Sequence, residues 1–96
     1  MPLFVIIGSD VANSTAQRQI HRPAHLARLT ALQEQNRLIL AGPTPIHHSD
    51  TAMSGSIIIA KFDDIDSAKA WADADPYFIH GIYSHVEIRP FIKALP

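Results

Sequence analysis

The sequence predicts an α+β protein whose elements follow the order β-α-β-β-α-β. Four short runs are rich in β-branched and other apolar residues, two segments carry apolar residues at helical spacing, and glycine, proline or aspartate residues separate them. The expected strands are Leu3–Gly8, Leu38–Ala41, Ser56–Phe62 and Ile82–Arg89, and the expected helices are Pro23–Asn36 and a later segment that ends near Ala74.

The first helix is expected to begin at Pro23, because proline lacks the N–H that would be unpaired in a first helical turn. The preceding segment, Asp10–Gln19, is polar and has the composition of a turn with at most a short helical piece. Within the helix, His25, Leu29 and Leu32 recur at a spacing that places them on one stripe. His25 is therefore expected to face the core rather than water.

The second strand is expected to end at Gly42-Pro43, and Thr44–Ser54 to form a loop that contains His47 and His48. Adjacent histidines can bind a metal ion, but two side chains without a third ligand make a poor site. No metal site is therefore expected in this loop.

The second helix is expected to begin in an acidic cluster formed by Asp63, Asp64 and Asp66. Carboxylates at a helix start cap free N–H groups and interact favourably with the helix dipole. At the other end, Pro76 restricts Asp75 to an extended conformation. Asp75 is therefore expected just beyond the last helical turn.

The last strand alternates between an apolar and a polar face. The apolar face is expected to carry Ile82, Val86 and Ile88, and the polar face Tyr83, His85, Glu87 and Arg89.

This element order is typical of a ferredoxin-like plait, an antiparallel sheet with two helices on one face. The first and third strands are central in that topology, and here Leu3–Ile7 and Ile57–Phe62 are apolar on both faces. A strand with one face in water would alternate apolar and polar residues. We therefore expect a homodimer in which the second sheet faces of two copies pack together.

Composition and charge exclude several functional classes. The 96 residues suffice for one domain, 1–96, with a modest core. A formal net charge of −1 and the lack of a basic run argue against a nucleic-acid partner. No apolar run reaches the roughly 20 residues that span a membrane, and without cysteine there is no disulfide or thiolate site. We expect a cytoplasmic protein without a cofactor, since no haem, flavin or nucleotide motif is present.

Two distant segments, Arg22–Leu29 and Ala70–Tyr77, carry the candidate chemistry. If the fold brings them together, the Asp75 carboxylate accepts a hydrogen bond from the His25 imidazole, orients it and stabilises its protonated form. Such a pair is a minimal acid–base centre at neutral pH. The alternatives are a core histidine bonded to a backbone carbonyl and an aspartate that only fixes the turn before the proline.

Several short motifs occur in the order and near the spacing of one known family. They are Arg22-Pro23-Ala24-His25-Leu26-Ala27-Arg28-Leu29, Ala41-Gly42-Pro43, Gly55-Ser56, Ala70–Tyr77, and Gly81-Ile82-Tyr83 with Arg89-Pro90-Phe91. With these motifs the chain resembles the YciI-like (YCII-related domain) proteins nearly from end to end. The resemblance implies a ferredoxin-like fold of the dimeric α+β barrel group. It also implies a catalytic pair, His25 and Asp75, with Ser56 near the same pocket. One branch of that family dehydrochlorinates a chlorinated hydroxyquinol.

The leading hypothesis is a small cofactor-independent enzyme in which His25 is the general acid or base and Asp75 orients it. Ser56 and Arg22 would bind a small-molecule substrate whose identity the sequence does not give. Elimination and isomerisation suit a single proton-transfer centre. Ser56 can also be read as a polar strand-edge residue, and Arg22 as a solvated or dimer-facing one. A non-catalytic ligand-binding or interaction module and a cofactor-free oxygenase are the alternative functions.

Overall fold

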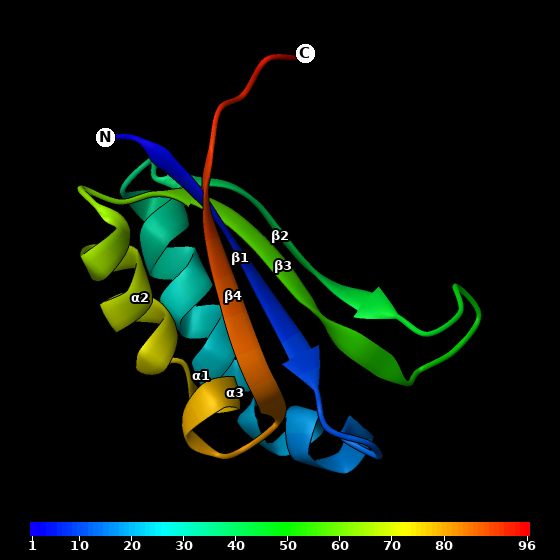
Figure 1. The fold of residues 1–96 in the computed structure, drawn as a ribbon. Helices are drawn as coiled ribbons and strands as arrows, with labels where there is room; N and C mark the ends of the chain where they lie inside the picture. Colours follow the sequence, from blue (N-terminus) through cyan, green and yellow to red (C-terminus); the bar gives the residue numbers. More distant parts are fainter.

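The computed structural model describes residues 1–96 and confirms the predicted α+β fold. One antiparallel sheet has the strand order β2-β3-β1-β4, with the helices on one of its faces (Figure 1). This is the ferredoxin-like order, in which β1 and β3 are central. The strands are β1 (Leu3–Asp10), β2 (Leu38–Pro45), β3 (Met53–Lys61) and β4 (Tyr83–Phe91), and the helices are α1 (Thr15–Glu34), α2 (Ile65–Asp73) and the short α3 (Pro76–Ile79).

Helix α1 begins at Thr15, so the predicted start at Pro23 is wrong and the proline lies inside the helix. The first turns are held to the end of β1 by the carboxylate of Asp10. Its Oδ2 atom accepts hydrogen bonds from the Ser14 hydroxyl and from Arg18 Nε, both at 2.6 Å. These buried contacts outweigh the backbone hydrogen bond that a proline removes from a helix. Three of the polar residues in the segment predicted as a turn, Asp10, Ser14 and Arg18, are therefore engaged in hydrogen bonds with one another.

Strand β2 continues beyond Gly42-Pro43 to Pro45, so the predicted loop Thr44–Ser54 shortens to a hairpin over 46–52. Prolines are tolerated here because β2 is an edge strand, where one side of the backbone needs no ladder partner. His47 and His48 lie exposed in this hairpin.

Strand β4 differs from simple alternation at its beginning. A register shift against Ser9 and Asp10 of β1 interrupts the ladder, and such an irregularity changes which side chains face the core. Tyr83, which the alternation predicted on the polar face, is buried at 5% exposure and packs with Ile82 and Val86. The period-two pattern was wrong at this residue because the bulge lies between Tyr83 and the regular part of the strand.

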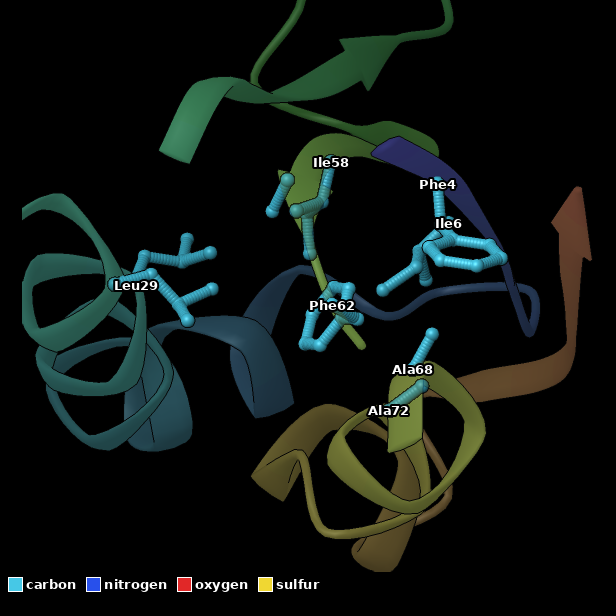
Figure 2. Close-up of a cluster of buried hydrophobic side chains, with 9 residues drawn as sticks. Phe4, Ile6, Leu29, Ile58, Phe62, Ala68 and Ala72 are labelled. Atoms are coloured by element: carbon cyan, nitrogen blue, oxygen red, sulfur yellow. The ribbon is translucent and has the colours of Figure 1, made fainter. Parts of the chain in front are cut away.

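The main core lies between the sheet and helices α1 and α2 (Figure 2). Its large side chains come from the central strands and α1, while Ala68 and Ala72 let α2 approach closely. The Asp64 side chain caps α2 by accepting from the Ser67 N–H at 2.7 Å, as the acidic cluster predicted. The labelled core residues are Phe4, Ile6, Leu29, Ile58, Phe62, Ala68 and Ala72.

The other face of the sheet carries no helix (Figure 1). Alternate residues of the central strands point to it, are apolar and are only partly buried in the single chain. They are Leu3, Val5, Ile7, Ile57 and Ile59.

Candidate active site

His25 and Asp75 meet between α1 and the start of α3. The His25 Nδ1 atom lies 2.9 Å from Asp75 Oδ1 and 3.0 Å from Oδ2, and the two side chains are 7% and 4% exposed. The contact that the sequence suggested between these residues is therefore present. A carboxylate only accepts hydrogen bonds, so Nδ1 carries the proton and the neutral ring keeps its lone pair on Nε2.

The backbone of α3 fixes the Asp75 carboxylate. Asp75 is the N-cap residue in an extended conformation, as the following Pro76 requires. Its Oδ1 atom also accepts the Tyr77 N–H at 2.8 Å. The turn-fixing role and the contact with His25 thus occur together in one side chain, and the cap leaves the carboxylate little freedom to turn away from the imidazole.

The Tyr77 ring packs against one face of the His25 imidazole. The two rings stack with centroids 3.9 Å apart and planes 8° from parallel. Burial raises the pKa of the Tyr77 hydroxyl, with Arg18 and Arg22 opposing part of the increase, so this tyrosine is neutral at physiological pH. The stacked ring and the Asp75 hydrogen bond together define the orientation of His25.

A pocket of about 190 Å³ opens beside this pair, between α1 and the β2–β3 side of the sheet. His25, Arg22 and Ser56 all line it, so three of the four predicted site residues share one cavity, while Asp75 lies behind the imidazole. The apolar part of the lining comes from Leu26, Leu29, Ala41, Pro43 and Ile58. An acid–base group, a hydroxyl and a cation therefore face one partly apolar cavity.

Arg18, which the sequence did not single out, also lines the pocket. Its Nε and Nη2 atoms donate to Asp10 Oδ2 and Oδ1 at 2.6 and 2.9 Å. Burial alone would lower the pKa of Arg18, but the hydrogen bonds and charge of Asp10 outweigh it and raise that pKa. The only sign of this ion pair in the sequence was that Asp10, Ser14 and Arg18 follow one another at intervals of four residues, at the start of a helix.

The two arginines of the pocket differ in their electrostatic state. Arg18 is paired with Asp10, whereas Arg22 is exposed and has no carboxylate within ion-pair distance. Arg22 is thus the cation that remains available to an anionic ligand.

Tyr83 has Ser56 as a neighbour but does not itself line the pocket. Its ring packs so closely against Gly8 that a Cβ atom there would come within 2.6 Å of the ring. The Tyr83 hydroxyl is buried and has no hydrogen-bond partner among the protein atoms. Burial strongly raises the pKa of this hydroxyl, and the neighbouring Ser56 hydroxyl opposes the increase in part.

No helix of the protein has both the length and the hydrophobicity needed to cross a membrane.

Comparisons with known proteins agree with the fold. The family model of the YCII-related domain matches residues 2–92. The chain is 46% identical over 95 residues to the protein YciI of Escherichia coli, covering 95% of this chain and 97% of that protein. It is 42% identical over 94 residues to an uncharacterized protein of Haemophilus influenzae, covering 94% and 96% of the two chains.

Among solved structures, the chain is similar to 5-chloro-2-hydroxyhydroquinone dehydrochlorinase from Burkholderia phenoliruptrix, in complex with 2,5-dihydroxybenzoquinone. The TM-score is 0.84 at 25% identity, and the alignment covers 96% of this chain and 95% of that one. The matched span and the identity to YciI confirm the resemblance seen in the sequence motifs, and the chain belongs to the YCII-related domain family.

Proposed function

We propose that this protein is a small cofactor-independent enzyme that moves a proton at the Nε2 atom of His25, in an elimination or an isomerisation. The observation that carries the proposal is the buried hydrogen bond between His25 Nδ1 and Asp75 at 2.9 Å, beside a pocket of about 190 Å³. A histidine whose other nitrogen is bonded to a fixed carboxylate is a typical general base.

In an elimination, neutral His25 accepts a proton from a substrate carbon through Nε2. The electrons of the broken C–H bond form the new double bond, and the leaving group departs with its bonding pair as an anion. Asp75 stabilises the imidazolium that forms, because its negative charge lies next to Nδ1. In an isomerisation, the same imidazolium returns the proton to a different atom of the substrate.

The substrate class follows from the pocket and from the dehydrochlorinase to which the chain is similar. A small hydroxylated ring compound matches the partly apolar lining, with Leu26 and Ile58 against its ring. Arg22 would bind an ionised hydroxyl or carboxylate of that compound, since its charge is unpaired. Ser56 would bind an oxygen of the same molecule.

The direct test is to incubate the protein with 5-chloro-2-hydroxyhydroquinone and to follow chloride release. We expect release with the wild type, a loss of at least about 100-fold in His25→Asn, and no change in His47→Asn, which alters an exposed hairpin histidine. Turnover that survives His25→Asn would contradict the assignment. A compound that binds this pocket and is recovered unchanged after long incubation would favour the non-catalytic binding module instead.

The proposal includes a homodimer that covers the uncovered sheet face. The apolar side chains on that face, such as Val5 and Ile59, support it, because a single chain leaves them partly in contact with water. A cytoplasmic location is part of the same proposal, and the lack of cysteine in the chain is compatible with it.

A further inference from the structure

The Ser56 hydroxyl is held in one hydrogen-bonding role. Ser56 is 4% exposed, and its Oγ atom lies 2.9 Å from Arg18 Nη2. A guanidinium has only donors, so Ser56 must accept in this bond. One lone pair of the serine oxygen is therefore committed to Arg18, and its proton has to point elsewhere.

The Arg18 guanidinium is itself held in place, so Ser56 stays the acceptor in this hydrogen bond. Both oxygens of Asp10 accept from its guanidinium, and Nη2 also donates to the carbonyl of Gly55 at 2.8 Å. Because Nη2 carries two hydrogens and one is directed at Asp10, the other is shared between Gly55 and Ser56. The Asp10 side chain is 1% exposed and that of Arg18 is 9% exposed. Bidentate pairs of this kind have a defined geometry, and burial keeps water from competing for the donors.

Tyr83 limits the other side of Ser56. Its buried hydroxyl lies near Ser56, but no hydrogen bond joins it to Ser56 or to any other protein atom. Tyr83 therefore does not hold the Ser56 proton through a hydrogen bond. With the Ser56 oxygen accepting from Arg18 and no protein acceptor bonded to its own proton, the open direction for that proton is the pocket that Ser56 lines.

We infer that Asp10 and Arg18 are positioning residues that turn the Ser56 hydroxyl into a hydrogen-bond donor aimed at the ligand. The pocket then pairs a donor, Ser56, with an acceptor, His25 Nε2. The ligand class with the complementary pattern is a small enolisable or quinonoid molecule that offers a removable proton and an oxygen able to accept a hydrogen bond. This ligand class rests on the proposed function.

The consequence for the reaction concerns developing charge. When His25 takes a proton from carbon next to a carbonyl, negative charge moves onto the carbonyl oxygen. A fixed donor at that oxygen stabilises the charge without having to reorient. Ser56 then touches the reacting group, whereas Arg18 and Asp10 act through it.

The first test needs no ligand. Neutron diffraction from deuterated crystals locates the deuteron on Ser56 Oγ. We expect it to point into the pocket, with Arg18 Nη2 donating to the serine oxygen. A deuteron directed at Tyr83 Oη, or at a backbone carbonyl such as that of Gly55, would overturn the inference, whatever the fate of the proposed reaction.

The second test is a double-mutant cycle on binding of 2,5-dihydroxybenzoquinone, followed by calorimetry. Ser56→Ala is expected to weaken binding about 3- to 10-fold, and Arg18→Lys, which keeps a cation beside Asp10 but loses the fork, by a similar factor. In the Ser56→Ala background, Arg18→Lys is expected to have no further effect on Kd. The control Ser54→Ala, an exposed serine of the same strand bonded to Thr44, leaves Kd unchanged.

Each outcome of the cycle has a distinct meaning. Equal losses from Arg18→Lys in both backgrounds would mean that Arg18 acts independently of Ser56, which overturns the inference. Thermal denaturation of the same variants identifies a purely structural effect of Arg18→Lys. Such an effect would lower Tm in both backgrounds, without the coupling to Ser56 that is expected in Kd. Binding without turnover would contradict the proposed reaction but leave the donor role of Ser56 intact. If the wild type does not bind this probe, the proposed substrate class fails and the neutron map alone decides the inference.

Discussion

His25 and Asp75 are separated by 50 residues in the chain, yet the Nδ1 and Oδ1 atoms of their side chains lie 2.9 Å apart. The contact joins the middle of α1 to the N-cap residue of α3. It therefore exists only when both helices are packed on the sheet, and the acid–base centre is a product of tertiary structure.

Replacing Asp75 by asparagine removes the charge beside His25 and also the acceptor that sets the His25 tautomer. The amide oxygen of Asp75→Asn can still accept the Tyr77 N–H, so the cap of α3 and the fold are expected to persist. The variant loses the negative charge that stabilises the imidazolium. We expect turnover of a converted substrate to fall by about 100-fold or more, with Tm little changed. A variant with full turnover would show that His25 works without this carboxylate.

Gly8 is required by the close packing of the Tyr83 ring. An alanine Cβ would approach that ring to 2.6 Å, which is too close without movement of β4. We expect Gly8→Ala to lower the free energy of unfolding by about 1–3 kcal/mol, as overpacking does in other cores. Chemical denaturation measures this difference. Gly42→Ala is the matched control in the same sheet, because no atom lies within 4 Å of its added Cβ, and it should be nearly neutral.

The cap of α2 gives a stability change in acid with a defined sign. Hydrogen bonds from Ser67 lower the pKa of the Asp64 carboxylate in the folded state. The stabilisation is therefore present above the unfolded aspartate pKa of about 3.9 and is lost as the pH falls through the lower folded value. Asparagine is also a good cap, so Asp64→Asn should keep the helix but show a smaller fall in denaturation midpoint between about pH 6 and about pH 3. An unchanged acid dependence would mean that Asp64 contributes nothing to it.

The uncovered sheet face predicts the oligomeric state. Light scattering of the wild type at micromolar concentration is expected to give the mass of two chains. Ile59→Lys, which places a charge in the centre of the apolar face, should give monomers that remain folded. Ile20→Lys is the control, because Ile20 is 64% exposed on α1, and it should remain dimeric. A monomeric wild type would contradict the homodimer.

The sequence was sufficient for the features that depend on local pattern. Apolar runs and capping residues predicted all four strands and α2, and helical periodicity placed His25 on an inward face. Its position within α1 was correct even though the helix begins earlier than expected. The face of Tyr83 was missed because the register shift in β4 comes from its pairing with β1, and nothing within the strand records it.

The site was predictable only in part, for a related reason. Arg18 and Asp10 are unremarkable in sequence, because a polar segment before a proline looks the same whether its side chains face water or each other. Their role appears once the end of β1 and the first turns of α1 are brought together with Gly55 and Ser56. Local pattern cannot report a buried ion pair between two elements.

The most direct test of the central claim is the protonation state of the His25 ring nitrogens, read from ¹⁵N chemical shifts in a long-range ¹H–¹⁵N NMR spectrum of the neutral imidazole. We predict a proton on Nδ1 and a free lone pair on Nε2 in the wild type. In Asp75→Asn, whose amide can donate to the ring, the Nδ1–H form should lose its preference. A wild-type ring protonated on Nε2, or one unchanged in Asp75→Asn, would contradict the claim that Asp75 sets His25 as the base of this site.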